Sequence, residues 1–124
     1  MVLGRTATEP LSTVETFPNP GVTYVEMEQT EFTALCPVTG QPDYGKVIVT
    51  YWPKDHCIES KSLKLYLLGF RNRGAFTEAL AVEIADNLQG TINPHDLTVK
   101  VIQAPRGGIS ISAVKRVTMD GQKG

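Results

Sequence analysis

The sequence contains few side chains of the kinds that form disulfides or bind metals. It has two cysteines and two histidines in 124 residues. Two cysteines are too few for a disulfide framework, and a structural zinc site needs about four ligands. The densest cluster is Asp55, His56 and Cys57, whose adjacent side chains do not converge well on one ion. The sequence therefore predicts free thiols in a reducing compartment and no structural metal.

Long apolar runs and an excess of charge of one sign are also missing. No stretch approaches the roughly 20 apolar residues that span a bilayer, and residues 1–21 lack the apolar core of a signal peptide. The formal net charge is -1, from 12 Lys and Arg against 13 Asp and Glu. This balance favours neither nucleic acid nor an anionic membrane as a partner. We expect a cytoplasmic protein.

The rest of the composition is typical of one globular domain. Hydrophobic residues make up 41% of the chain and charged residues 20%, and a chain of this length can bury a modest core. Residues 1–20 contain four Thr and three Pro without periodicity, which indicates an extended or frayed arm. We expect the domain over residues 21–118 and a short tail over residues 119–124.

Hydrophobic periodicity predicts the order of the elements. Apolar side chains alternate over residues 22–32 and 46–52, and again over 96–104 and 107–117, which predicts four strands. Between the two pairs the spacing becomes helical. One helix carries the apolar stripe Leu63, Tyr66, Leu67 and Phe70, and a second is expected from about Ala75 until Gly90 ends it.

This order predicts an α+β fold with a four-stranded, mainly antiparallel sheet and both helices on one face (ββααββ). Such an arrangement buries one face of the sheet and leaves the other face and the two edges to be covered. A chain this small would cover them by assembly, so we expect a homo-oligomer.

Cys36 is the first candidate for chemistry. It ends a predicted strand and opens the loop "CPVTGQPD", where Gly40 and Pro42 could return Asp43 to the thiol. A free cysteine is often only a small buried hydrophobe. The alternative is a nucleophile, because a thiolate with a lowered pKa attacks well near neutral pH and a carboxylic acid in a dry pocket can deliver a proton.

The stretch "ESKSLKLY", Glu59 to Tyr66, also permits two interpretations. It can be a solvated helix start with Ser60 as the cap and Lys61 and Lys64 facing water. Alternatively, the helix N-terminus, the hydroxyls and the lysines bind a phosphate, with Arg106 of "APRGGIS" contributing to the same site. Glu78 is a weaker candidate: it suits the first turn of the second helix, and it could also accept a bidentate pair of hydrogen bonds from a guanine-like base.

Taken together, five stretches closely resemble one family. "ETFPNP", "EFTALCPVTGQPD", "ESKSLKLYL", "FRNRGAF" and "PRGGISI" resemble the short, single-domain form of the NADPH-dependent 7-cyano-7-deazaguanine reductases, from about Val14 to Ser112. The resemblance implies a tunnelling fold whose subunits join their sheets into rings, with active sites at subunit interfaces. It also implies reduction of the nitrile to 7-aminomethyl-7-deazaguanine in queuosine biosynthesis, a tRNA modification pathway.

The resemblance implies a role for each matching residue. Cys36 aligns with the nucleophile that forms a covalent thioimide, and Asp43 with the proton donor. Glu78 aligns with the residue that holds the base edge, and Thr77 lies beside it. Ile58, Glu59 and Ser60 align with positions that contact the substrate. The residues expected to contact NADPH are Ser60, Lys61, Ser62, Lys64, Tyr66 and Arg106.

The chain departs from the family pattern at two places. Thr77 replaces the usual histidine of an "FHE" motif, and a threonine is neither an acid nor a base at neutral pH. The C-terminus after Ser112 is short. Three alternatives therefore stay open: an amidinotransferase that uses ammonia on the same adduct, a pterin enzyme of the same fold, and a deazapurine-binding ring without turnover. Relatives of the first kind lack "ESKSLKLY", and two histidines are too few for most of the second.

Overall fold

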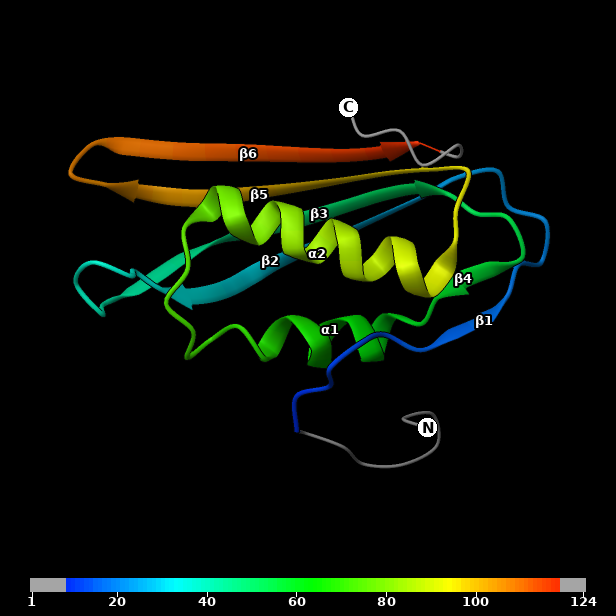
Figure 1. Cartoon of the computed structure of the whole chain (residues 1–124), viewed down its shortest axis with the longest axis horizontal. Coiled ribbons are helices and arrows are strands. Elements are labelled where there is room, and N and C mark those ends of the chain that lie inside the picture. The colour runs from blue at the N-terminus through cyan, green and yellow to red at the C-terminus, as the bar shows by residue number, and fades with distance from the viewer. Residues whose placement is uncertain (1–8, 119–124) are drawn as a thin grey trace.

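A computed structural model describes residues 9–118 of the chain (Figure 1). The predicted tail, residues 119–124, and the first eight residues of the predicted arm lie outside this range. The elements in chain order are β1 (Thr16–Pro18), β2 (Val25–Leu35), β3 (Pro42–Trp52), β4 (His56–Ile58), α1 (Ser60–Leu68), α2 (Thr77–Ile92), β5 (Asp96–Arg106) and β6 (Ile109–Thr118).

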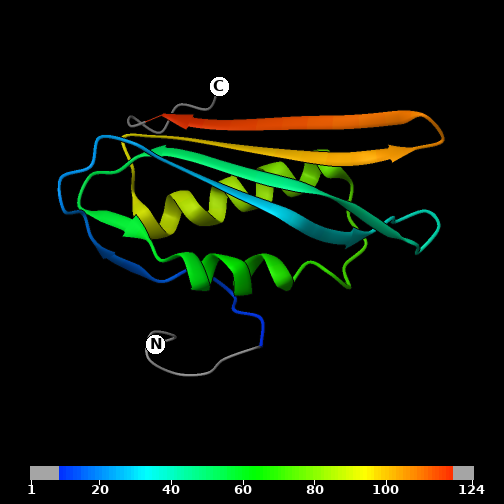
Figure 2. The ribbon, with the colours of Figure 1, turned by 180° about the vertical axis from the view of Figure 1, so that it is seen from behind.

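The main sheet has the strand order β2-β3-β5-β6, with every neighbouring pair antiparallel. Both helices cover the same face, as the two opposite views show (Figures 1 and 2). The α+β prediction with the order ββααββ is therefore confirmed, although the strand ends differ from the predicted ones by a few residues. Successive side chains of a strand point to opposite faces of the sheet. On β3, Val47, Val49 and Tyr51 point to the face that the helices cover and are almost fully buried.

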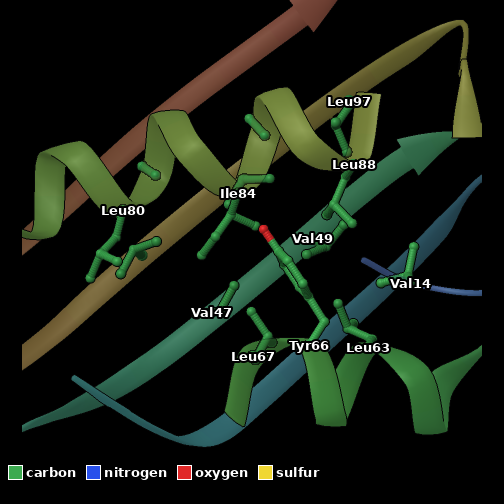
Figure 3. Packing of buried hydrophobic residues seen from close by; sticks show 14 of the residues in the cluster. Val14, Val47, Val49, Leu63, Tyr66, Leu67, Leu80, Ile84, Leu88 and Leu97 are labelled. Atoms are coloured by element: carbon green, nitrogen blue, oxygen red, sulfur yellow. The ribbon is translucent and has the colours of Figure 1, made fainter. Parts of the chain in front are cut away.

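The core lies between the helices and the sheet (Figure 3). The predicted helical stripe Leu63, Tyr66, Leu67 and Phe70 is buried in full. From α2, the side chains Leu80, Ile84 and Leu88 pack on the sheet. Each buried side chain of this size contributes about 1.5–3 kcal/mol relative to leaving it exposed, so the two amphipathic helices hold the layer together.

The predicted end of α2 at Gly90 is wrong. The helix continues through Gly90 to Ile92 because Leu88 and Ile92, four residues apart, are both buried against the sheet. Their burial outweighs the roughly 1 kcal/mol cost of a glycine in a helix interior. The helix ends instead at Asn93, which takes the left-handed conformation with a φ of 45° and is followed by Pro94.

The part of the predicted arm that the structure describes packs against α1 and β4. β1 pairs with β4 in a separate two-stranded sheet that the sequence did not predict. Val14 belongs to the hydrophobic core and is only 3% exposed. The backbone amide of Glu59 donates to the carbonyl of Glu15 at 2.8 Å. These contacts fix the start of α1 from the N-terminal side.

The far face of the main sheet carries charged and apolar side chains. Lys46 lies 3.4 Å from Glu28 across β3 and β2, and Arg116 lies 2.6 Å from Asp96 across β6 and β5. Val114 of the edge strand β6 is 59% exposed. Within residues 9–118, neither helix is long and apolar enough to cross a membrane.

Candidate active site

Cys36 lies in a tight loop that joins β2 to β3. The Gly40 amide donates to the Cys36 carbonyl at 2.8 Å, and the Cys36 amide donates to the Gln41 carbonyl, also at 2.8 Å. Gly40 has a φ of 72°, which favours glycine at this position. The loop therefore presents Cys36, which is partly exposed, at the open end of the hairpin.

The groups around Cys36 lower the pKa of its thiol. The main cause is a hydrogen bond from the Thr39 side chain, and the backbone amides of Thr39 and Val38 add to it. Burial and the negative charge of Asp43 act in the opposite direction but are smaller effects. Hydrogen bonds to the charged form favour the thiolate, the nucleophilic form of cysteine. The sequence pointed to Cys36 but not to Thr39 or Val38, because their role depends on the loop's backbone.

Asp43 lies beside Cys36 on the same hairpin. It is the Cα partner of Ala34, two residues before Cys36, and the charges of Asp43 and Cys36 interact. Its side chain is 13% exposed. The carboxylate accepts a hydrogen bond from Nη1 of Arg106 at 2.5 Å, and Nη2 of Arg106 donates to the Gln41 side chain at 2.6 Å. The structure thus brings together the two residues that the sequence predicted as nucleophile and proton donor.

Arg106 is in a different place from the predicted phosphate site at α1. It ends β5, just before the turn at Gly107 and Gly108, whose φ values of 61° and 87° suit a tight hairpin loop. An irregularity between Gln103 and Arg106 shifts the register of β5 against β6. Such an irregularity changes the direction in which the side chains at the end of the strand point. The ion pair with Asp43 raises the pKa of Arg106. All hydrogen bonds described for its side chain go to the Cys36 hairpin.

The N-terminus of α1 is capped by Glu59, and the prediction of Ser60 as the cap is wrong. The Glu59 carboxylate accepts from the amides of Lys61 and Ser62 at 2.8 and 2.7 Å. Sequence patterns favour serine as a cap, but Glu59 has the extended backbone of a cap residue with a ψ of 127°. A phosphate at these amides would have to displace the carboxylate.

Two residues of the predicted cofactor motif are part of the core. Ser62 is fully buried; its hydroxyl donates to the Glu59 carbonyl at 2.7 Å and accepts from the Glu15 amide at 2.8 Å. Tyr66 is 3% exposed, and its hydroxyl accepts from the Asn87 side chain at 2.8 Å. Burial raises the pKa of Tyr66. Their burial argues against direct contact with a cofactor.

A groove beside α1 contains the exposed part of this motif. It runs between α1 and the edge strand β2 and has a cavity volume of about 310 Å³. Such a volume is at the lower end of the range of ligand sites. Ser60 and Lys64 are exposed and contribute to its wall, together with Gln29 of β2. The ammonium group of Lys64 favours an anionic ligand, whereas the carboxylate of Glu28, which also lines the groove, opposes one.

Backbone hydrogen bonds connect the loop before α2 to Leu35, the last residue of β2 and the neighbour of Cys36. The Leu35 amide donates to the Arg73 carbonyl at 2.8 Å, and the Ala75 amide donates to the Leu35 carbonyl at 3.2 Å. Arg73 itself is held by two hydrogen bonds to Glu83, at 2.6 and 2.9 Å. These bonds place the start of α2, with Thr77 and Glu78, close to Cys36.

Thr77 is 5% exposed and donates a 2.7 Å hydrogen bond to Oε1 of Gln103 on β5. Glu78, the next residue, is exposed in the first turn of α2. Between α2 and the hairpin is a small hollow with a cavity volume of about 10 Å³, about the room of one water molecule, which opens to solvent. Asp43, Gly45, Thr77 and Gln103 are among its lining residues. The sequence did not point to Gln103, because its contact with Thr77 spans 26 positions.

Ile58, Glu59 and Ser60 are not near this pocket. The Cys36 loop, the start of α2 and the end of β5 lie at one end of the molecule, whereas β4 and the start of α1 lie toward the other (Figures 1 and 2). The eleven residues of β3 alone separate these ends, which corresponds to about 33 Å at the rise of a strand. Within one chain, the two groups of predicted substrate contacts cannot touch the same bicyclic molecule.

Comparisons with known proteins show that the chain belongs to the QueF-like family. The family described as QueF-like protein matches residues 42–121. The NADPH-dependent 7-cyano-7-deazaguanine reductase of Granulibacter bethesdensis is 43% identical over 116 residues, covering 88% of this chain and 76% of the relative. The reductases of the same name from Rhodopirellula baltica and Anaeromyxobacter sp. are 43% and 46% identical over 105 residues, covering 82% of this chain and 87% and 86% of theirs.

A solved structure has the same fold. The crystal structure of the archaeosine synthase QueF-Like in the apo form matches with a TM-score of 0.74, covering 80% of this chain and 96% of that one. At 22% sequence identity this likeness concerns the fold alone.

Proposed function

Because the chain belongs to the QueF-like family, we propose that it is an NADPH-dependent reductase that converts 7-cyano-7-deazaguanine to 7-aminomethyl-7-deazaguanine for queuosine biosynthesis. The observation that carries the proposal is Cys36, a partly exposed thiol whose pKa is lowered by Thr39 and the backbone amide of Val38, beside Asp43. Binding alone would require neither a stabilised thiolate nor an adjacent carboxylate. A cytoplasmic location is part of the same proposal.

Cys36 begins the reaction by attacking the nitrile carbon. The sulfur–carbon bond forms as one π bond of the nitrile opens, and the nitrogen takes up a proton to give a thioimide. NADPH supplies one hydride in each of two reductions. After the first reduction the nitrogen lone pair expels the Cys36 thiolate and leaves an imine, which the second reduction converts to the amine. Two NADPH and two further protons are consumed per nitrile, and splitting the reduction in this way is the usual gain from covalent catalysis.

Asp43 moves the protons in this scheme. It lies in an ion pair with Arg106, which fixes the carboxyl group beside Cys36. A carboxylate can take the proton of the Cys36 thiol during attack and pass it to the nitrile-derived nitrogen. Arg106 holds Oδ1 of Asp43, so the other oxygen is the one that transfers the proton.

The cofactor binds in the groove along α1. Ser60 and Lys64 would hold its anionic end, since both are exposed on the groove wall. Ser62 and Tyr66 support the helix from the core and do not contact the cofactor in this proposal. Lys61, half-buried in the first turn, stays a predicted contact.

The active site is completed by a second copy of the chain. Glu59 and Ser60 of one copy meet Cys36, Asp43 and Glu78 of another, because one chain holds these groups at different ends (Figure 1). Ile58, which is 3% exposed, stays a predicted contact. The edge strands β2 and β6 are long enough to pair between copies and join the sheets into a ring. We therefore propose a homo-oligomer with interface active sites.

The proposal is tested by NADPH oxidation with 7-cyano-7-deazaguanine, followed by absorbance. Wild type should consume two NADPH per nitrile, and Cys36→Ala should consume none. Asp43→Asn should still bind the substrate but react slowly, because the amide cannot carry the proton. Intact mass after incubation without NADPH should show one substrate mass added to wild type and none to Cys36→Ala.

The same experiment separates the alternatives. An adduct on Cys36 without NADPH oxidation would favour the amidinotransferase or a binding protein over the reductase, and turnover with ammonia would distinguish those two. Absence of both adduct and oxidation in an assembled, folded protein would refute covalent nitrile chemistry altogether.

A further inference from the structure

The hydrogen bond between Thr77 and Gln103 places a polar pair at the inner wall of the pocket. Thr77 takes the position where the resemblance predicts a histidine. Its hydroxyl donates to Oε1 of Gln103 at 2.7 Å, and the threonine itself is 5% exposed. A threonine alone can orient a partner but offers little to a ligand. The partner, Gln103, is the residue that gains a fixed orientation.

Gly45 lies beside Gln103 in the sheet. The two residues are Cα partners in adjacent strands, on the face that the helices cover. A Cβ at position 45 would overlap the carbonyl of Ile102, so only glycine fits there. Gly45 and Gln103 both line the pocket, together with Asp43 and Thr77.

The orientation of the Gln103 amide follows from its bond to Thr77. With Oε1 accepting from the threonine, the amide nitrogen carries two N–H groups. Within residues 9–118 no hydrogen bond involves this nitrogen. Arg106, the nearby cation, is already engaged by Asp43 and Gln41. Tyr44 also borders the pocket, but strand alternation directs its side chain to the opposite face from Asp43. Gln103 is therefore the uncommitted side-chain donor of this pocket.

We propose that Gln103 is a substrate-positioning residue, which donates a hydrogen bond from Nε2 to the ring carbonyl of the deazaguanine, and that Thr77 fixes the amide for this purpose. The proposal rests on the proposed function for the identity of the ring. A guanine edge presents a carbonyl acceptor beside two kinds of N–H donor. Gln103 supplies the donor, and Glu78, adjacent to Thr77 in α2, supplies the acceptors.

The decisive test compares two ring compounds that differ at one atom. 7-Deazaguanine has the carbonyl, and 7-deaza-6-thioguanine has a thiocarbonyl, a weaker hydrogen-bond acceptor, in its place; both keep the ring N–H and the amine from which Glu78 would accept. Neither has a nitrile, so binding is measured without chemistry, by isothermal titration calorimetry on the full-length protein. Wild type should bind 7-deazaguanine about 5-fold more tightly than the thio compound through this bond. Gln103→Leu should lose that preference and bind both compounds with similar affinity.

Two further variants separate positioning from structure. Thr77→Val keeps the shape but removes the hydroxyl, so it should reduce the preference only partly, because Gln103 remains but is free to turn. Gln89→Leu makes the same chemical change in α2 outside the pocket and should leave the preference at the wild-type value. If Gln103→Leu weakens both compounds equally, or wild type shows no preference, the positioning role is refuted.

The outcome is independent of whether the protein reduces nitriles. A carbonyl preference that disappears in Gln103→Leu, together with no NADPH oxidation and no adduct in wild type, would support the binding role and reject the proposed function. In a working reductase, Gln103→Leu should raise KM for the nitrile about 5- to 10-fold with a smaller change in kcat. A fall in kcat at unchanged KM would contradict a role in holding the substrate.

Discussion

Ser62→Ala should destabilise the protein without weakening its affinity for NADPH. The Ser62 hydroxyl is fully buried and makes two short hydrogen bonds, with the Glu15 amide at 2.8 Å and the Glu59 carbonyl at 2.7 Å. Each such bond contributes about 1 kcal/mol net, so the free energy of unfolding should fall by about 2 kcal/mol. For a chain of this size the melting temperature should fall by roughly 6–12 °C.

The matched control is Ser60→Ala, the same chemical change on the exposed side of the same helix start. It should leave the free energy of unfolding within about 0.5 kcal/mol of wild type. Urea denaturation at equal protomer concentration, with the m-value compared between variants, measures both. Equal concentrations are necessary because the proposed assembly of subunits would add to the apparent stability.

The cofactor measurement is the critical part. Well below its melting temperature, Ser62→Ala should keep KM for NADPH within about twofold of wild type, a difference of about 0.4 kcal/mol. Ser60→Ala and Lys64→Ala should raise it, because these side chains lie on the wall of the groove. If Ser62→Ala has wild-type stability but a raised KM for NADPH, its hydroxyl is a cofactor contact and the division of the motif into core and groove residues is incorrect.

Three further substitutions test local features. Thr39→Val should raise the pKa of the Cys36 thiol, because it removes the largest stabilising contact of the thiolate. The pH midpoint of Cys36 alkylation by iodoacetamide, measured by mass spectrometry, should therefore move to higher pH. An unchanged midpoint would contradict this. Gly90→Ala should increase the free energy of unfolding by about 0.5–1 kcal/mol, since a Cβ there meets nothing within 4 Å inside a helix; a decrease in urea denaturation would refute it. Gly45→Ala should lower the melting temperature, because a Cβ would overlap the Ile102 carbonyl, and wild-type stability would show that the strands relax.

The periodic elements of the fold were predictable because burial dictates their pattern. Val47, Val49 and Tyr51 alternate toward the helices, and Leu63 and Phe70 lie on one helical stripe. The β1–β4 sheet was not predictable, because strands of three residues have no measurable period. The helix α2 continues past Gly90 because Leu88 and Ile92, on either side of it, are buried against the sheet. Local helix propensity does not include this tertiary burial, so it does not predict the end of the helix.

The candidate site was partly predictable for a different reason. Cys36 and Asp43 are close in sequence and share a hairpin, so the loop composition alone suggested that they meet. The contact of Arg106 with Asp43 could not be predicted, because only the strand order brings the end of β5 beside the start of β3. Gln103 could be found only from its three-dimensional contact with Thr77.

The placement of the two substrate-contacting groups at different ends of the chain (Figure 2) has a genetic consequence. In an assembly whose sites combine both ends, a chain defective at Cys36 still offers an intact Ile58 end to its neighbour. A chain defective at Ile58 still offers an intact Cys36. Two alleles that are each inactive alone would then restore activity when expressed together, while two alleles damaged at the same end would not. In the proposed assembly, selection on this gene would act on pairs of chain ends contributed by different molecules.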